Sequence, residues 1–197
     1  MLKRVLLIGV LVVLAGASAS CIFDPPKTDK GGPPPTTYTF YDLSKEWHVL
    51  ANIESAYNAR KIEKYDQLLD DNFTFFLYHG DVGGEIPASW DRATEVLYNT
   101  RLFDKSYPTN TCKSISMDLQ FDPNNISWVD VVPDQSKYPG ETWKTAVIYY
   151  AFRFDVLPDT QYESVAGARG QFTIRNIGTA EKPQWRLVEF SDLGDGL

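Results

Sequence analysis

The feature that most restricts the fold of this 197-residue chain is the segment TWKTAVIYYAFRFDVL, residues 142–157. Apolar residues recur at every second position along it, which is the period of a β-strand with one buried face. The even-numbered set is almost entirely apolar: Ala146, Ile148, Tyr150, Phe152, Phe154 and Val156. The odd-numbered set mixes aromatic, polar and charged side chains: Trp143, Thr145, Val147, Tyr149, Ala151, Arg153 and Asp155. We therefore expect a long strand whose even positions face a core.

Further strands are predicted on both sides of this segment. Residues 113–121 alternate in the same way, and residues 167–177 and 184–192 complete an antiparallel meander. An earlier segment rich in aromatic residues and threonine, NFTFFLY at residues 72–78, predicts one more strand.

Three helices are predicted ahead of the meander, because apolar residues recur there at helical spacing. The helices are expected over residues 45–60, 61–71 and 91–104. Asp42 or Ser44 is the candidate N-cap of the first helix, and Asp91 or Ser89 is that of the third. Their apolar faces are, in order, Val49, Leu50, Ile53, Ala56 and Tyr57; Ile62, Tyr65, Leu68 and Leu69; and Ala93, Val96, Leu97 and Phe103. Helices followed by strands predict an α+β domain, with about three N-terminal helices packed on one face of a curved, mainly antiparallel sheet.

The first 20 residues have the three parts of a secretory signal. A short basic start, MLKR, precedes the apolar run VLLIGVLVVLA at residues 5–15, and small residues follow. The apolar run is shorter than the roughly 20 residues that span a bilayer as a helix. We therefore expect export of the chain and no permanent membrane span.

Two processing routes fit the end of this signal. The sequence SASC at residues 18–21 resembles a bacterial lipobox, with Ser18 in place of the usual leucine, and predicts a lipid on Cys21. Acyl chains on Cys21 would hold the protein on a membrane surface. The alternative is cleavage after the small-x-small sequence at residues 17–19, which would allow a disulfide between Cys21 and Cys112. We favour lipidation, which makes Cys112 a half-buried structural thiol.

The rest of the chain divides into a tether and one domain. Residues 21–38 are rich in proline and glycine and predict an extended tether, and residues 39–197 are long enough for a single core. Ile22, directly after Cys21, suits sorting to the outer membrane on its periplasmic side. Localisation in a bacterial cell envelope, anchored by lipid, is therefore predicted.

Charge excludes some partners. The chain has a net charge of −7, which becomes −9 if Lys3 and Arg4 leave with the signal. An acidic domain without a basic stripe predicts that nucleic acid is not a partner. The same negative net charge argues against direct docking of the domain on anionic lipid headgroups.

The order of elements resembles a known superfamily. The sequence NIESAYNARKIEKYDQLLDDNFTFF at residues 52–76 and the final QWRLVEFSD at residues 184–192 are similar to those of the nuclear transport factor two-like (SnoaL-like) superfamily. Within it, the chain is most similar to bacterial envelope lipoproteins. The resemblance implies a cone-shaped α+β fold with a pocket between helices and concave sheet. Enzymes of the superfamily place a carboxylate or histidine in that pocket.

The predicted interior offers little acid–base chemistry. On the inward strand faces the only polar groups are the Tyr150 hydroxyl and Asn176, so we expect a filled core or an apolar pocket. The pocket candidates are Tyr57, Tyr65, Trp90 and Tyr150. His48 and His79 are expected to be partly exposed and solvated. We predict no catalytic residue, no metal site and no cofactor, since no ligand spacing or phosphate loop is present.

The outward face of the sheet combines aromatic side chains with arginine, a composition typical of interfaces. Its candidate residues are Trp143, Tyr149, Arg153 and Arg175. Members of the superfamily frequently dimerise through this sheet, so the resemblance implies a homodimer or an envelope protein partner. The alternative is a solvated face with cross-strand ion pairs.

Two hypotheses on function follow. The first is a membrane-tethered domain that binds an apolar small molecule or a protein partner without catalysis. The second is an enzyme of the isomerase or dehydratase kind that uses Tyr57, Tyr150 or His79 in the pocket. The apolar inward faces favour the first hypothesis.

Overall fold

A computed structural model describes residues 37–82, 87–108, 110, 112–156 and 161–195. The predicted signal peptide, Cys21 and all but the end of the predicted tether lie outside these residues. Among the described residues, no helix is both long and apolar enough to cross a membrane.

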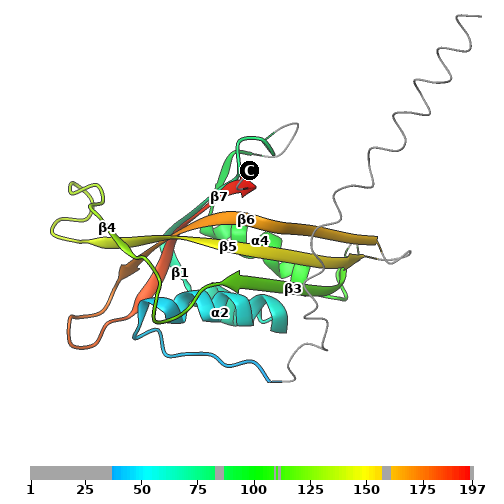
Figure 1. The fold of residues 1–197 in the computed structure, drawn as a ribbon, viewed down its shortest axis with the longest axis horizontal. Coiled ribbons are helices and arrows are strands. Elements are labelled where there is room, and N and C mark those ends of the chain that lie inside the picture. The colour runs from blue at the N-terminus through cyan, green and yellow to red at the C-terminus, as the bar shows by residue number, and fades with distance from the viewer. Residues whose placement is uncertain (1–36, 83–86, 109, 111, 157–160, 196–197) are drawn as a thin grey trace, which may run out of the picture. The chain divides into compact units, whose positions relative to one another are not determined.

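Seven strands of the described residues form one curved, unclosed sheet (Figure 1). They are β1 (Leu69–Phe76), β2 (Ser89–Asp91), β3 (Cys112–Gln120), β4 (Val129–Val131), β5 (Trp143–Val156), β6 (Gln161–Asn176) and β7 (Trp185–Asp195). The order across the sheet is β2-β1-β7-β6-β5-β3, and β4 pairs with β5. The predicted antiparallel meander of β5, β6 and β7 is confirmed. One pair, β1 with β7, is parallel, and the short strands β2 and β4 were not predicted.

Three helices pack against this sheet, as the sequence predicts: α2 (Glu46–Ala59), α3 (Ile62–Asp66) and α4 (Arg92–Phe103). The prediction of a helix over residues 61–71 was wrong beyond Asp66. The chain leaves the helix there because Leu69 begins β1 and lies opposite Leu187 of β7. Pairing across the sheet thus overrides the helical pattern of the local sequence.

The helix caps were predicted in part. Asp91 caps α4, since its carboxylate accepts the Thr94 N–H at 2.9 Å. The prediction that Asp42 or Ser44 caps α2 was wrong, because the N-cap is Lys45, which makes no capping hydrogen bond through its side chain. Asp42 instead accepts the Ser44 backbone N–H and hydroxyl.

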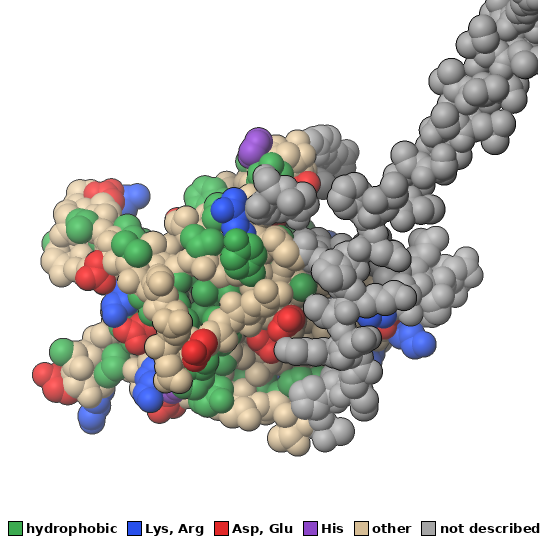
Figure 2. All heavy atoms as spheres, in the orientation of Figure 1, with side chains coloured by type: hydrophobic (Ala, Val, Ile, Leu, Met, Phe, Trp, Pro, Cys, Tyr) green, Lys and Arg blue, Asp and Glu red, His purple; other side chains and the backbone are tan. Residues whose placement is uncertain are grey.

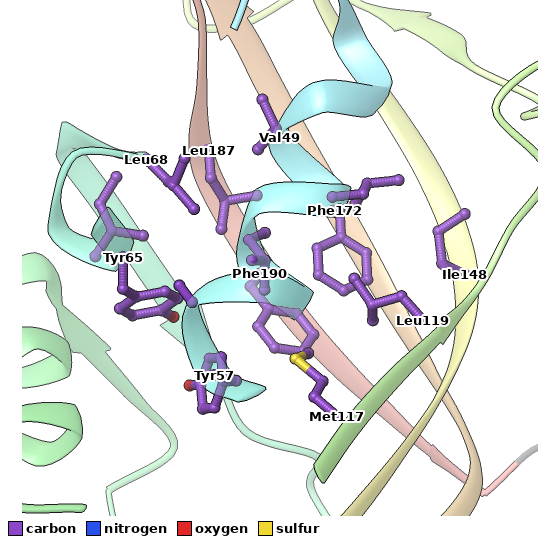
Figure 3. Close-up of a cluster of buried hydrophobic side chains, with 14 of the residues drawn as sticks. Val49, Tyr57, Tyr65, Leu68, Met117, Leu119, Ile148, Phe172, Leu187 and Phe190 are labelled. Atoms are coloured by element: carbon purple, nitrogen blue, oxygen red, sulfur yellow. The ribbon is translucent and has the colours of Figure 1, made fainter. Parts of the chain in front are cut away.

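The core lies between α2 and the concave face of the sheet (Figure 3). The predicted apolar face of α2 is buried, and so are the inward residues of the strands that it covers. Those strand residues include Ile115, Met117, Leu119, Ala146, Ile148, Tyr150, Phe172 and Ile174. The alternation read from residues 142–157 is confirmed over residues 146–150, since Val147 and Tyr149 are about half exposed (50% and 49%) between buried neighbours, and Phe152 and Phe154 are partly buried against the core.

Helix α2 also covers the open edge of the sheet, where it runs beside β3 (Figure 1). The Asn58 side chain accepts the Met117 N–H at 2.7 Å and donates to the Met117 carbonyl at 2.9 Å. Glu54 Oε2 accepts the Leu119 N–H at 3.2 Å. These two side chains take the place of a neighbouring strand for three backbone groups of the edge, the N–H and C=O of Met117 and the N–H of Leu119.

Candidate functional site

Three of the four pocket candidates named from the sequence, Tyr57, Tyr65 and Trp90, lie near one buried carboxylate, Glu95 of α4. Glu95 is only 4% exposed. Its Oε1 accepts the Tyr65 hydroxyl at 2.6 Å and Asn99 Nδ2 at 2.8 Å. Its Oε2 accepts the Trp90 indole N–H at 2.5 Å. Tyr65 comes from α3 and Trp90 from β2, so three elements meet at this carboxylate. We call Glu95 with its three donors the Glu95 cluster.

Aromatic rings fill the space beside the Glu95 cluster. The Tyr57 ring packs against the rings of Tyr65, Phe103 and Phe152, with centroids 5.1, 5.1 and 5.2 Å away. Tyr150 joins this group through Phe152, at 5.7 Å. Figure 3 shows Tyr57 and Tyr65 together at one end of the core. This part of the cone interior is therefore packed with side chains.

The buried face of α4 agrees with the prediction in part: Phe103 is buried and Val96 packs against the core as expected, but Glu95 is buried where Ala93 and Leu97 were expected to be. Residues Ala93 and Leu97 were expected to be buried, but Ala93 is exposed and Leu97 is 46% exposed. The buried stripe is Glu95, Asn99 and Phe103, which recur every four residues. The hydrogen bonds from Tyr65, Trp90 and Asn99 explain why Glu95 can be buried, because they compensate for the loss of water around the carboxylate. The four-residue spacing of Glu95, Asn99 and Phe103 was the pattern in the sequence from which this buried stripe could have been predicted.

Electrostatics keep the tyrosines of the cluster neutral. Burial raises the pKa of the Tyr57 hydroxyl, and the negative charge of Glu95 raises it further. Burial and Glu95 also raise the pKa of Tyr65 well above its usual value. Both hydroxyls are therefore hydrogen-bond donors and not bases at neutral pH.

The same geometry limits what the Glu95 cluster can do chemically. A general base has to reach the proton that it abstracts. Both oxygens of Glu95 already accept hydrogen bonds from side chains of the protein, and one of these donors must leave before a substrate can take its place. In this arrangement the carboxylate holds α3, β2 and α4 together through its hydrogen bonds to Tyr65, Trp90 and Asn99.

A surface groove lies between α2, β3 and the segment before α2. Its volume is about 500 Å³, within the range of small-molecule sites. Tyr38, Tyr41, Trp47 and Phe121 supply aromatic rings, and Glu54 and Asp118 supply carboxylates; no Lys, Arg or His is among the described residues that line it. We call it the α2–β3 groove. It was not predicted, because the segment at residues 37–41 has no periodic pattern.

The two histidines differ in their surroundings. The expectation of a solvated imidazole was wrong for His48, which is 7% exposed. Its Nδ1 lies 3.0 Å from Asp42 Oδ1, and its ring stacks on Tyr41. His79 is exposed, and its ring lies 4.4 Å from that of Tyr78.

Cys112 lies at the start of β3 and is half-buried. Its Sγ donates to the Ser114 carbonyl at 3.2 Å and accepts Arg60 Nη2 at 3.4 Å. Among the described residues, no group of three or more His, Cys, Asp or Glu could hold a metal ion.

The candidate residues of the outward sheet face fall into two sets. Arg175 and Trp143 are held within the molecule: Arg175 Nε lies 2.8 Å from Asp70, and the Trp143 indole donates to Glu141 at 2.8 Å. Tyr149 is half exposed, and Arg153 is exposed with its Nε 3.5 Å from Asp155. Figure 2 shows charged and hydrophobic side chains interspersed over the face in view.

The comparisons with known proteins identify the fold. No protein-family model matches the sequence, and no curated protein matches it either. A nuclear transport factor 2 (NTF2-like) superfamily protein from Salmonella enterica serovar Typhimurium is 10% identical, with a TM-score of 0.50 over 76% of this chain and 87% of that chain.

Two further solved structures have the same general likeness. ActVI-ORFA from Streptomyces coelicolor is 10% identical (76% and 93% covered, TM-score 0.46). An NTF2-like protein of unknown function in nutrient uptake from Rhodospirillum rubrum is 14% identical (74% and 94% covered, TM-score 0.45). The likeness to the Salmonella protein, at a TM-score of 0.50, shows that the fold of this chain is NTF2-like, as the resemblance in the sequence implies.

Proposed function

We propose that this domain binds a small molecule or a partner without catalysing a reaction, and that the α2–β3 groove is its binding site. The observation that carries the proposal is the state of Glu95. Three side chains of the protein already occupy its carboxylate oxygens. Aromatic rings fill the neighbouring interior, whereas the groove is a concave site of suitable size at the surface.

Native mass spectrometry of the full-length protein, extracted from its own membranes in mild detergent, tests this proposal. We expect a small molecule to co-purify. A Trp47→Leu variant, which alters the groove, should lose it. A Tyr65→Phe variant, which alters the Glu95 cluster, should keep it. Loss from the Tyr65 variant with retention by the Trp47 variant would place the ligand inside the cone and refute the proposal.

The proposal includes a lipid on Cys21, which would hold the domain at the periplasmic side of an outer membrane. The signal-like residues 1–20 and the Pro- and Gly-rich residues after Cys21 support it. The same mass spectrum gives the N-terminus: an acylated Cys21 is expected, and a mass that begins at Ser20 without lipid would contradict it. A Cys21→Ala variant should leave the membrane fraction.

One observation favours an alternative, an enzyme of the isomerase or dehydratase kind. The structure buries a carboxylate, Glu95, next to the hydroxyl of Tyr65 and close to Tyr57. If a substrate displaced Tyr65, the carboxylate could act as a general base in a water-poor site. A turnover that Glu95→Gln abolishes, while Tyr150→Phe leaves it unchanged, would support this alternative.

The outward sheet face is proposed as a contact for a second copy or an envelope protein. Val147 and Tyr149 support it, since both apolar side chains are about half exposed on β5. Sedimentation of the mature protein should show a dimer that a Tyr149→Lys variant weakens. A wild-type protein that stays monomeric at high concentration would count against this contact.

A further inference from the structure

One wall of the α2–β3 groove is the segment through which the chain enters the domain. Residues 37–42, drawn in blue, run alongside α2 and belong to no helix or strand (Figure 1). Four of them line the groove: Thr37, Tyr38, Thr39 and Tyr41. We call residues 37–42 the strap. The groove is therefore complete only while the strap is in place.

Side chains of α2 hold the strap. Asn52, which is 3% exposed, accepts the Tyr41 N–H at 2.7 Å and donates to the Tyr41 carbonyl at 2.9 Å. The Ser55 hydroxyl donates to the Thr39 carbonyl at 3.0 Å. Among the described residues, no backbone–backbone hydrogen bond joins the strap to the rest of the domain. The strap can therefore detach without breaking a helix or a pair of strands.

The strap also buries little of its own surface. Tyr38 and Phe40 are half-buried, and the other four strap residues are exposed. Phe40 packs against the core, and the Tyr41 ring stacks on His48 at 4.8 Å. Segments with few buried apolar contacts open locally at a lower free energy than the whole domain. The strap has these properties, whereas α2 beneath it belongs to the core.

The strap is followed by a residue in an uncommon backbone conformation. Leu43 has a φ of 65°, in the left-handed region that a bulky side chain rarely adopts. Its side chain is 9% exposed, and its carbonyl accepts the Trp185 N–H of β7 at 2.9 Å. Residues in such conformations persist where surrounding contacts hold them, and they cluster at ligand clamps and switch regions. Leu43 thus marks the boundary between the fixed domain and the strap.

We propose that the strap is a movable wall of the α2–β3 groove, which detaches from α2 as a unit about Leu43 while the rest of the domain stays folded. Opening removes one wall of the groove and lets a ligand enter or leave. A ligand that contacts the strap holds it closed, because it binds the closed state more tightly than the open one. This inference rests on the proposed function, since it names the regulation of the same site.

Hydrogen exchange of single amides, read by NMR on the full mature chain in mild detergent, tests the inference. The Tyr41 amide reports on the strap. The Met117 amide of β3 is the matched control, because an asparagine of α2, Asn58, also accepts its N–H at 2.7 Å. After correction for intrinsic rates, we expect Tyr41 to exchange at least about 100-fold faster than Met117. Low urea should accelerate Met117 and leave Tyr41 nearly unchanged, since a local opening exposes little surface.

Two variants locate the opening. Ser55→Ala removes the hydrogen bond to Thr39 and should accelerate Tyr41 exchange about two- to ten-fold, with Met117 unchanged. Thr100→Ala is the matched control, since it removes a hydroxyl that donates to a backbone carbonyl, that of Val96, on another helix, α4. Its Tyr41 exchange rate should equal that of the unchanged protein.

The outcomes separate this inference from the proposed function. Equal exchange of Tyr41 and Met117, with the same dependence on urea, would show that the strap opens only with the whole domain and would overturn the inference. Equal acceleration of both amides by Ser55→Ala would overturn it too. Removal of the co-purified small molecule should accelerate Tyr41 exchange, and an unchanged rate would overturn the coupling of strap and ligand. Absence of a co-purified molecule would count against the proposed function, while the exchange rates would still decide whether the strap detaches.

Discussion

Replacing Glu95 by glutamine tests whether the Glu95 cluster holds the helices and β2 together as its geometry indicates. Glutamine keeps the size of the side chain but turns one oxygen into an NH₂ donor. Tyr65 and Asn99 both donate to Oε1, so the glutamine oxygen is expected at that place. Its NH₂ group then faces the indole N–H of Trp90, and two donors oppose each other.

The size of the effect follows from these contacts. A buried donor that loses its acceptor costs about 1–3 kcal/mol, and hydrogen bonds to a charged acceptor are stronger than those to a neutral one. Part of the loss is offset, because the neutral side chain is less costly to bury. We expect Glu95→Gln to lower the free energy of unfolding by about 1–3 kcal/mol.

A double-mutant cycle with Trp90→Phe isolates the opposed donors. Phenylalanine preserves an aromatic ring to stack on Phe75, which lies 4.3 Å from the Trp90 ring, and removes the N–H. In the unchanged protein this replacement should cost about 1–2 kcal/mol, and in the Glu95→Gln background it should cost less, with a coupling of about 1–2 kcal/mol. Urea unfolding followed by circular dichroism gives each value. Additive effects within about 0.5 kcal/mol would refute the geometry of the cluster.

Three further predictions concern pH and the edge of the sheet. Burial and Glu95 raise the pKa of Tyr65, so the folded state holds the phenol proton more tightly than the unfolded state. The resulting stability is present below about pH 10 and is lost at higher pH. Tyr65→Phe should therefore flatten the alkaline fall in melting temperature. Hydrogen bonds from the Thr94 backbone and side chain lower the pKa of Asp91. Its contribution to the free energy of unfolding is therefore present above about pH 4 and is lost as the pH falls through the folded-state pKa. In acid titrations, the stability of the Asp91→Asn variant should fall less steeply with pH. Asn58→Ala leaves the β3 edge without two hydrogen bonds and should cost about 1–3 kcal/mol in urea unfolding and promote aggregation; an unchanged midpoint would show that water replaces the side chain.

The sequence predicted those parts of the fold that local patterns determine. Alternation over residues 146–150 and the apolar face of α2 both proved correct, because each belongs to a pattern that repeats its period several times. The parallel pairing of β1 with β7 could not be predicted, since it joins distant segments whose local pattern does not encode a partner. The length of α3 was overestimated for the same reason: its last leucine belongs to that pair.

The candidate site was predicted only through its aromatic members. Tyr57, Tyr65, Trp90 and Tyr150 were named as pocket candidates, but Glu95, which Tyr65 and Trp90 both contact, was missed. A charged residue on a helix is normally solvent-exposed, and its burial here depends on donors from α3 and β2. The α2–β3 groove forms only when an irregular segment, a helix and an edge strand meet, so no single stretch of sequence shows it.

The central claim is that the binding site is the α2–β3 groove and not the cone interior. The most direct test records the indole N–H signals of Trp47 and Trp90 by two-dimensional NMR, each assigned with a Trp→Phe variant. The protein is observed before and after addition of a methanol extract of the envelope fraction from the same cells. We predict that the Trp47 signal shifts and the Trp90 signal stays in place. A shift of Trp90 with Trp47 unchanged would contradict the account and return attention to Glu95.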